Sequence, residues 1–200
     1  MLGTVTTPVR CEGKETEPAD DTGQVARLLP KFWARLHAFI RLRASPQLLA
    51  RESSRDLAQT VCGEAMKSNG RARFESEAHF ARWLCTIAIH KLVTRKRQLT
   101  SQKRCPAPGK ELSAPEEVEL AEAYGAFLSP LESAARRECV ERLERAMAEL
   151  PGDYLEVVTL AQIMQLPRRE VGEIMGRSEV AVRQLLARAL AQLGARLSRA

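Results

Sequence analysis

Arg183, Gln184 and Arg188 lie close together near the C-terminus, and their side chains could read the bases of DNA. In the major groove an arginine pairs with guanine and a glutamine with adenine. All three fall largely outside an apolar stripe that recurs at helical spacing and consists of Val182, Leu185, Leu186, Ala189 and Leu193. The spacing therefore predicts a helix over 179–193 that buries one face and presents these polar side chains on another.

A second, shorter helix is predicted over 168–175, and the residues between the two helices are Gly-Arg-Ser. Gly176 can reverse the chain because glycine tolerates positive φ, and the Ser178 hydroxyl can accept from the amides of the next turn. This layout is typical of a helix-turn-helix, whose second helix docks in the major groove. An ordinary helical hairpin is the alternative interpretation.

The composition favours an all-α chain. Hydrophobic residues make up 44% and aromatic residues only 4% of the 200 residues, and alanine and leucine dominate while β-branched runs are missing. The net charge of +6 is unevenly distributed: the segment 91–104 has six basic residues and no acid, whereas 111–122 has five acids and no base. This segregation suggests that 91–104 forms a patch that binds the phosphates of a nucleic acid, whereas 111–122 belongs to a linker that does not contact them.

Helical spacing and turn residues divide the chain into two small helical domains. We expect a disordered arm over 1–22, an N-terminal domain over 23–99, a flexible linker over 100–130 and a C-terminal domain over 131–200. A transient helix around 117–127 is the alternative for part of the linker. The expected helices cover 25–42, 54–65, 78–97, 131–150, 154–165, 168–175 and 179–193. Pro30 should lie in the first turn of its helix or mark a break there, because proline lacks the amide hydrogen that a helix interior uses.

Both domains resemble parts of bacterial RNA polymerase sigma factors. The run from Glu141-Arg-Leu-Glu-Arg, through Glu170-Val-Gly-Glu-Ile-Met-Gly176, to Ser178-Glu-Val-Ala-Val182 resembles domain four of that family. In the N-terminal domain, Asp56-Leu-Ala-Gln59 and Phe80-Ala-Arg-Trp-Leu84 are similar to motifs of domain two. The resemblance covers about 25–97 and 131–196, and on it the chain is identified as a member of the sigma-70 family, of the small extracytoplasmic-function type. Ser53 and Thr60 depart from the pattern, since the family often has acids at these positions.

The resemblance implies three binding sites. The residues expected to bind core RNA polymerase are Asp56, Leu57, Gln59 and Thr60. The residues expected to bind the minus-10 element of promoter DNA are Arg71, Arg73, Phe74, His79, Trp83, Lys91, Arg95, Lys96 and Arg97. The residues expected to bind the minus-35 element are Arg177, Ser178, Glu179, Arg183, Gln184 and Arg188.

Each site has a chemical rationale and a structural alternative. Within one helical turn, Asp56, Leu57 and Gln59 would expose an acid, an apolar side chain and an amide to polymerase, although an acid at a helix start also favours the dipole. Aromatic rings beside a basic loop could stack the bases of an opened duplex, whose phosphates need cations. Alternatively, Phe80 and Trp83 are core residues; we favour the core for Phe80 and leave Trp83 open.

Other kinds of chemistry find little support in the sequence. The five cysteines are odd in number and form no CxxC, and we find neither a signal-peptide pattern nor a run of about 18 apolar residues, so we expect a cytoplasmic protein with unpaired thiols. The spacing of His79, Cys85 and His90 does not put them on one helical face, so we expect no metal site and no cofactor. Motifs typical of enzymes, such as GxxxxGK[ST], GxSxG and HExxH, are missing, so we expect no catalytic activity.

The sequence thus predicts a sigma factor whose partners are core RNA polymerase and promoter DNA. The resemblance implies an anti-sigma inhibitor as a further partner. Two alternatives stay open: a stand-alone helix-turn-helix regulator that acts without polymerase, and an all-helical interaction protein such as an inhibitor of another sigma factor.

Overall fold

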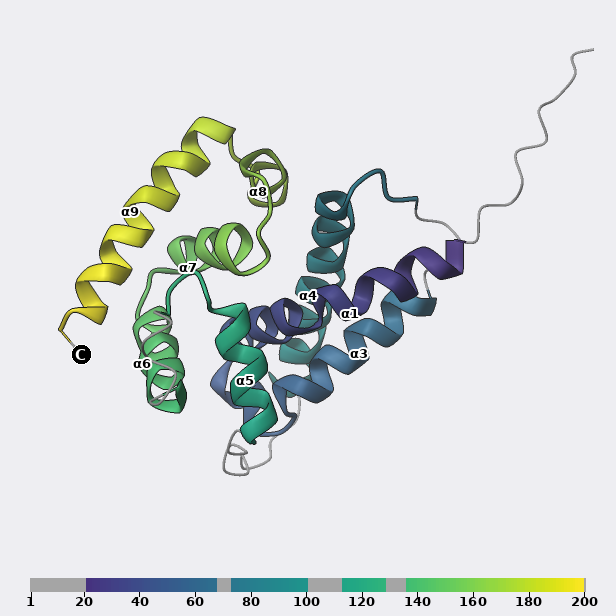
Figure 1. The fold of residues 1–200 in the computed structure, drawn as a ribbon, viewed down its shortest axis with the longest axis horizontal. Coiled ribbons are helices and arrows are strands. Elements are labelled where there is room, and N and C mark those ends of the chain that lie inside the picture. Colours follow the sequence, from purple (N-terminus) through teal and green to yellow (C-terminus); the bar gives the residue numbers. More distant parts are fainter. Residues whose placement is uncertain (1–20, 68–72, 101–112, 129–135, 200) are drawn as a thin grey trace, which may run out of the picture.

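The computed structural model describes residues 21–67, 73–100, 113–128 and 136–199, and within these ranges the chain is all-α, as predicted. Figure 1 shows its helices, which are α1 (Asp21–Arg43), α2 (Pro46–Leu49), α3 (Ser54–Lys67), α4 (Glu77–Thr100), α5 (Ala114–Ala123), α6 (Arg136–Ala148), α7 (Gly152–Val158), α8 (Arg168–Met175) and α9 (Glu179–Leu197). A π-helical turn, Thr159–Ile163, continues α7. Among the described residues, no helix combines the length and the apolar character needed to cross a membrane.

The N-terminal half of the described chain, residues 21–100, is built around α1, α3 and α4. Each of these helices buries an apolar stripe against the other two, and the stripes include Phe32, Leu36, Phe39, Leu57, Val61, Phe80, Leu84 and Ala88. Because these positions recur three or four residues apart, one face of each helix leaves water as the bundle forms. The start of α3 is capped by Ser53, whose Oγ accepts from the Asp56 amide at 3.1 Å. Phe80 is fully buried, as predicted.

Pro30 lies inside α1, so the prediction that it would occupy the first turn or break the helix was wrong. The helix begins at Asp21, and tertiary contacts hold the turns that precede the proline. Val25 is fully buried, and the Gln24 Nε2 atom donates to the Phe74 carbonyl at 2.9 Å. Pro30 itself is exposed, where its ring meets solvent.

Part of the expected linker is a packed helix. Ser113 and Glu116 form a capping box at the start of α5, and α5 lies against α1 with Leu120, Ala123 and Tyr124 buried. The linker expected over 100–130 therefore contains a packed helix, where the sequence indicated only a transient helix around 117–127. Residues 101–112 and 129–130 of the expected linker lie outside the described residues, as does most of the expected N-terminal arm.

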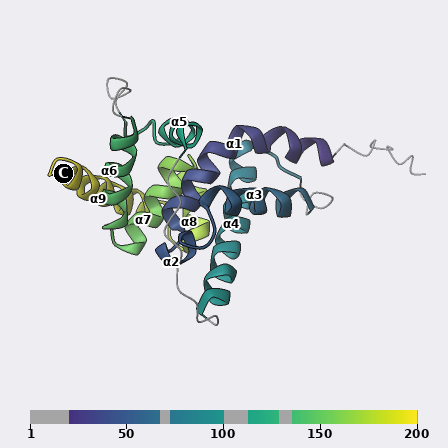
Figure 2. The same cartoon turned by 90° about the horizontal axis from the view of Figure 1, so that it is seen from below.

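The C-terminal half, residues 136–199, packs α6, α7, α8 and α9 around a second group of apolar side chains. It includes Val140, Leu143, Met147, Val158, Leu160, Val171, Val182 and Leu193. The two halves contact each other, because α1 meets α6 and the π-helical turn while α4 meets α8. Figure 2 shows α6 and α9 at the end of the molecule opposite to the start of α1.

Candidate nucleic-acid interface

The turn between α8 and α9 has the geometry that the sequence predicts. Gly176 has φ of 64°, a left-handed conformation that glycine adopts without strain, and it ends α8. The Ser178 Oγ atom then accepts from the Ala181 amide at 3.2 Å and caps α9. The helix-turn-helix is therefore present, with α8 over the expected residues and α9 running beyond residue 193 to Leu197.

The sequence analysis did not predict that a second glycine of this motif, Gly172, is required for close backbone packing. An added Cβ at this position would lie 2.5 Å from the carbonyl oxygen of Arg177, and that contact is too close to exist. The Arg177 amide also donates to the Gly172 carbonyl at 2.9 Å, so the chain after the turn passes directly over α8. The spacing of four residues between Gly172 and Gly176 was the available signal.

The second helix presents its polar residues to solvent. Arg183, Gln184 and Arg188 are all exposed, while the opposite stripe of Val182, Leu186, Ala189 and Leu193 is buried and Leu185 is half-buried. Of the other residues expected at the minus-35 site, Glu179 is exposed in the first turn of α9 and Arg177 forms an ion pair with Asp153 of α7. The six expected residues thus lie in the turn before α9 and along its first half, and the exposed flank that major-groove docking requires is available.

The basic stretch of α4 is partly neutralised by acids from elsewhere in the chain. Lys91 pairs with Glu64 of α3, and the Arg95 Nε atom lies 3.4 Å from a carboxylate oxygen of Glu52. Lys96 and Arg97 are exposed at the end of the helix. The run of cations that is free of acids in the sequence therefore has acidic neighbours in the fold, which lowers the net positive potential of this surface.

Phe74 is buried, so its expected exposure for base stacking is not seen in this structure. Its ring is 8% exposed and its centroid lies 4.9 Å from that of Trp83 and 5.1 Å from that of Phe80. Tilted and edge-on ring pairs at such distances are stabilising, which explains why the ring packs inward. Trp83 and His79 are half-buried beside it, Arg73 is exposed, and Arg71 lies outside the described residues.

The residues expected to bind polymerase are split between surface and core. Asp56 and Gln59 are exposed on α3, and Thr60 is half-buried with its Oγ1 atom donating to the Asp56 carbonyl at 2.9 Å. Leu57 is fully buried, so its expected place on the surface was wrong. Its spacing of four residues from buried Val61 was the signal for a core position.

A buried polar cluster joins three segments that are distant in sequence. The His37 Nε2 atom lies 2.9 Å from the Ser54 Oγ atom, and its Nδ1 atom lies 3.6 Å from a carboxylate oxygen of Glu119 on α5. That carboxylate also accepts from the Trp33 Nε1 atom at 3.0 Å and from Arg55 at 3.1 Å. The cluster therefore attaches α5 to α1 and α3.

The contacts from Ser54 to His37 and from His37 to Glu119 resemble those of a hydrolase triad. The burial of His37 and Ser54 excludes hydrolysis at this cluster. His37 is fully buried and Ser54 is 5% exposed, so a substrate carbonyl cannot approach the hydroxyl. Burial lowers the pKa of His37 because it disfavours the imidazolium form. A neutral His37 is thus the form that the fold accommodates.

Cys62 and Cys85 lie among packed side chains and lack the environment of a reactive thiol. Burial raises the pKa of the Cys62 thiol to about 11, and it raises the pKa of Cys85 as well. Both thiols therefore stay protonated near neutral pH, whereas the thiolate is the reactive form. Within the described ranges, no group of three or more His, Cys, Asp or Glu side chains could hold a metal ion.

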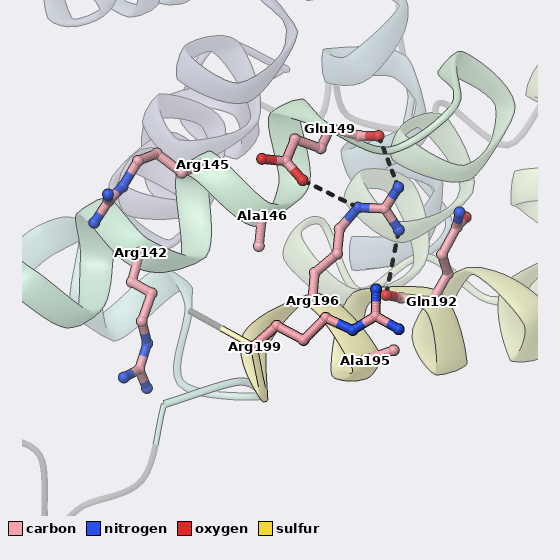
Figure 3. A pocket seen from close by; sticks show the side chains of 8 residues that line it. All are labelled: Arg142, Arg145, Ala146, Glu149, Gln192, Ala195, Arg196 and Arg199. Carbon is pink, nitrogen blue, oxygen red and sulfur yellow. Dashed lines mark hydrogen bonds and ion pairs between the residues drawn. The ribbon is translucent and has the colours of Figure 1, made fainter.

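A basic groove lies between α6 and α9, at the end of α9 opposite to its recognition residues. Figure 3 shows its lining side chains, among them Arg142, Arg145, Arg196 and Arg199. Arg196 bridges the two helices, because its Nη2 atom donates to the Glu149 carbonyl at 3.2 Å and its Nη1 atom to the Gln192 carbonyl at 3.4 Å. This arginine therefore links the end of α9 to the residue that follows α6.

The comparison with protein families agrees with this geometry. Residues 140–193 match the family described as Sigma-70, region 4, and this range contains α7, α8 and most of α6 and α9. No curated protein matches the chain. The match covers the helix-turn-helix together with the helices that support it, and the exposed polar flank of α9 lies within it. Residues 140–193 are therefore similar to sigma-70 region 4 in sequence, and they contain a helix-turn-helix whose second helix faces solvent with its polar residues.

Proposed function

We propose that this protein is a sigma factor of the extracytoplasmic-function type, which binds core RNA polymerase and directs promoter-specific initiation of transcription. The observation that carries the proposal is the region 4 match over 140–193 combined with exposed Arg183, Gln184 and Arg188 on the second helix of the motif. In this function the chain selects a promoter and helps to open it, and polymerase performs the chemistry.

Each half has its own task in the proposal. The C-terminal half reads the minus-35 element in the major groove through α9, with Arg177, Ser178 and Glu179 at the helix start. The N-terminal half binds polymerase through exposed Asp56 and Gln59, and it binds the minus-10 element through the α4 surface that bears His79, Trp83 and Arg97. An anti-sigma protein is a further partner, and the cytoplasm is the compartment in which these partners meet.

The first experiment identifies a promoter and separates a sigma factor from a stand-alone regulator. The purified chain is mixed with a random-sequence DNA library, with and without bacterial core RNA polymerase, and the bound DNA is sequenced and used in run-off transcription. A sigma factor enriches a two-part element only with core polymerase and starts transcripts at a fixed distance from it. Enrichment of DNA without polymerase, and no transcripts with it, would instead establish the regulator.

A second experiment tests the polymerase surface. The double variant Asp56→Asn, Gln59→Ala should lose affinity for core polymerase, and its circular dichroism spectrum should stay that of the wild type because both side chains are exposed. The matched control is Glu138→Gln, Gln47→Ala, which changes an exposed acid and an exposed amide on α6 and α2. Equal core affinity for the two variants would remove Asp56 and Gln59 from the interface.

A further inference from the structure

The first helix of the helix-turn-helix lies against the α4 surface of the N-terminal half. Arg82 of α4 stands between two glutamates of α8: its Nε atom lies 2.9 Å from a Glu170 carboxylate oxygen, and its Nη1 atom donates to Glu173. The Arg82 side chain is 30% exposed, so the contact is partly withdrawn from water. Partial burial of a doubly paired guanidinium strengthens the attraction relative to a pair on the open surface.

A groove beside this contact is lined by residues that the proposed function assigns to DNA. A groove of about 490 Å³ lies at this junction, where α4 contributes His79, Arg82, Trp83, Thr86, Ile89 and His90, and α8 contributes Glu173 and Ile174. His79 and Trp83 belong to the proposed minus-10 surface. In this arrangement the acidic side of α8 therefore borders the place where a DNA backbone would have to pass.

The rest of the junction has the same charge pattern. Arg41 of α1 pairs with Glu144 of α6 at 2.6 Å, and Arg43 pairs with Glu156 of α7 at 3.0 Å. The Tyr124 hydroxyl donates to Glu144 at 2.9 Å, and burial raises the pKa of this tyrosine, so the hydroxyl keeps its proton. In each of these ion pairs, the N-terminal half supplies the arginine and the C-terminal half supplies the glutamate. The acids of the C-terminal half thus neutralise cations of the N-terminal half.

We propose that this packing is an autoinhibited state, in which Glu170 and Glu173 of α8 occupy Arg82 in place of DNA phosphate and keep the α4 surface closed. The inference rests on the proposed function, because it takes α4 as a DNA-binding surface. Carboxylate and phosphate oxygens both accept paired hydrogen bonds from a guanidinium group, so the DNA backbone competes with α8 for the same arginine. Promoter DNA reaches the α4 surface only after α8 leaves α4.

The test uses a variant that removes the two carboxylates and a control with the same change of charge. Glu170→Gln, Glu173→Gln weakens the contact with Arg82, whereas Glu122→Gln, Glu138→Gln removes two exposed acids on α5 and α6. Small-angle X-ray scattering of the full chain, without DNA or polymerase, should give a larger radius of gyration for the first variant alone. Identical scattering of both variants and the wild type would overturn the proposal.

The second readout is affinity for DNA, measured by fluorescence anisotropy with a labelled random-sequence single strand. If about 90% of the wild-type molecules are closed, opening raises the apparent affinity about tenfold above that of the control variant. A variant that opens but binds no better than the control would show that α8 does not mask DNA binding, and this would also overturn the inference.

A charge exchange checks that the contact is direct. Arg82→Glu should open the chain, and adding Glu170→Arg and Glu173→Arg should restore the compact scattering profile. If the triple variant has the circular dichroism of the wild type but stays expanded, the contact of Arg82 with Glu170 and Glu173 does not hold the two halves together. These scattering results are independent of run-off transcription, so a chain that closes as proposed but directs no initiation would disprove the sigma assignment alone.

Discussion

The two candidate DNA surfaces of this protein differ in how ready they are to bind. On α9 the polar residues Arg183, Gln184 and Arg188 are exposed, and the helix is held from behind by its buried stripe. On α4 the cations Arg82, Lys91 and Arg95 are paired with glutamates. The first surface is preformed, whereas the second is occupied by the protein's own acids and rings.

The difference follows from where the neighbouring charges come from. Helix α9 lies at the edge of the molecule, as Figure 1 shows, whereas α4 contacts both α3 and α8. Because α3 and α8 each bring glutamates to α4, DNA phosphate that binds there has to displace these carboxylates. Four variants test this difference, and they follow in order of decreasing expected effect.

The largest effect is expected for Phe74→Ala. A buried ring that is replaced by a methyl group leaves a cavity among Trp83, Phe80 and His79, so the free energy of unfolding should fall by about 3–5 kcal/mol. Urea denaturation followed by circular dichroism measures this loss. Arg73→Ala, next to it and exposed, should change stability by less than about 0.5 kcal/mol. Normal stability of Phe74→Ala, with weakened DNA binding, would mean that the ring is available for bases after all.

Gly172→Ala tests whether the preformed surface depends on close backbone approach. The new Cβ would collide with the Arg177 carbonyl, and the strain should lower the free energy of unfolding by about 1–3 kcal/mol. Gly194→Ala, in open space within α9, should instead raise it by about 0.5–1 kcal/mol, because alanine favours a helix. Thermal unfolding of both variants reads the difference, and the same sign for both would contradict the packing described for the turn.

Arg183→Ala tests base reading by α9 on the DNA selected with core polymerase. A base-reading arginine should lose about 1–3 kcal/mol of binding, concentrated at one base pair of the minus-35 element. Binding to a panel of duplexes with single substitutions locates that base pair. Arg145→Ala, in the groove at the far end of the domain, is the control that should leave the panel unchanged. An equal loss on all duplexes would instead make Arg183 a phosphate contact.

The smallest effect concerns pH and His37. Burial lowers its folded-state pKa below the ordinary value of 6.5, so the unfolded chain takes up the proton first as pH falls. Stability from this group is therefore complete above pH 6.5 and decreases below it, and the free energy of unfolding should drop between pH 7 and 5. His37→Asn should flatten that dependence, whereas His79→Asn should preserve it. A wild-type profile that rises towards low pH would contradict the sign.

Local sequence determined the parts of the structure that depend on short-range geometry. Gly176 and Ser178 specify the turn because left-handed φ and a capping hydroxyl are properties of single residues. The stripe from Val182 to Leu193 specifies the buried side of α9, and with it the exposed flank, because a helix repeats every 3.6 residues. Buried Leu57 was accessible to the same reasoning, since its spacing from Val61 marks the core side of α3.

Only the tertiary structure decided which side chains meet across long separations. Nothing near Lys91 or Arg95 in the sequence indicates that Glu64 and Glu52 will neutralise them, and nothing near Arg82 points to Glu170. The sequence around Glu119 is acidic, and this composition predicts a solvated linker. In the fold, the Glu119 carboxylate contacts His37, Trp33 and Arg55, and α5 is a packed helix. Local patterns fix the conformation of a segment, but the state of a charge depends on the neighbours that folding brings within a few ångströms, and those come from distant parts of the chain.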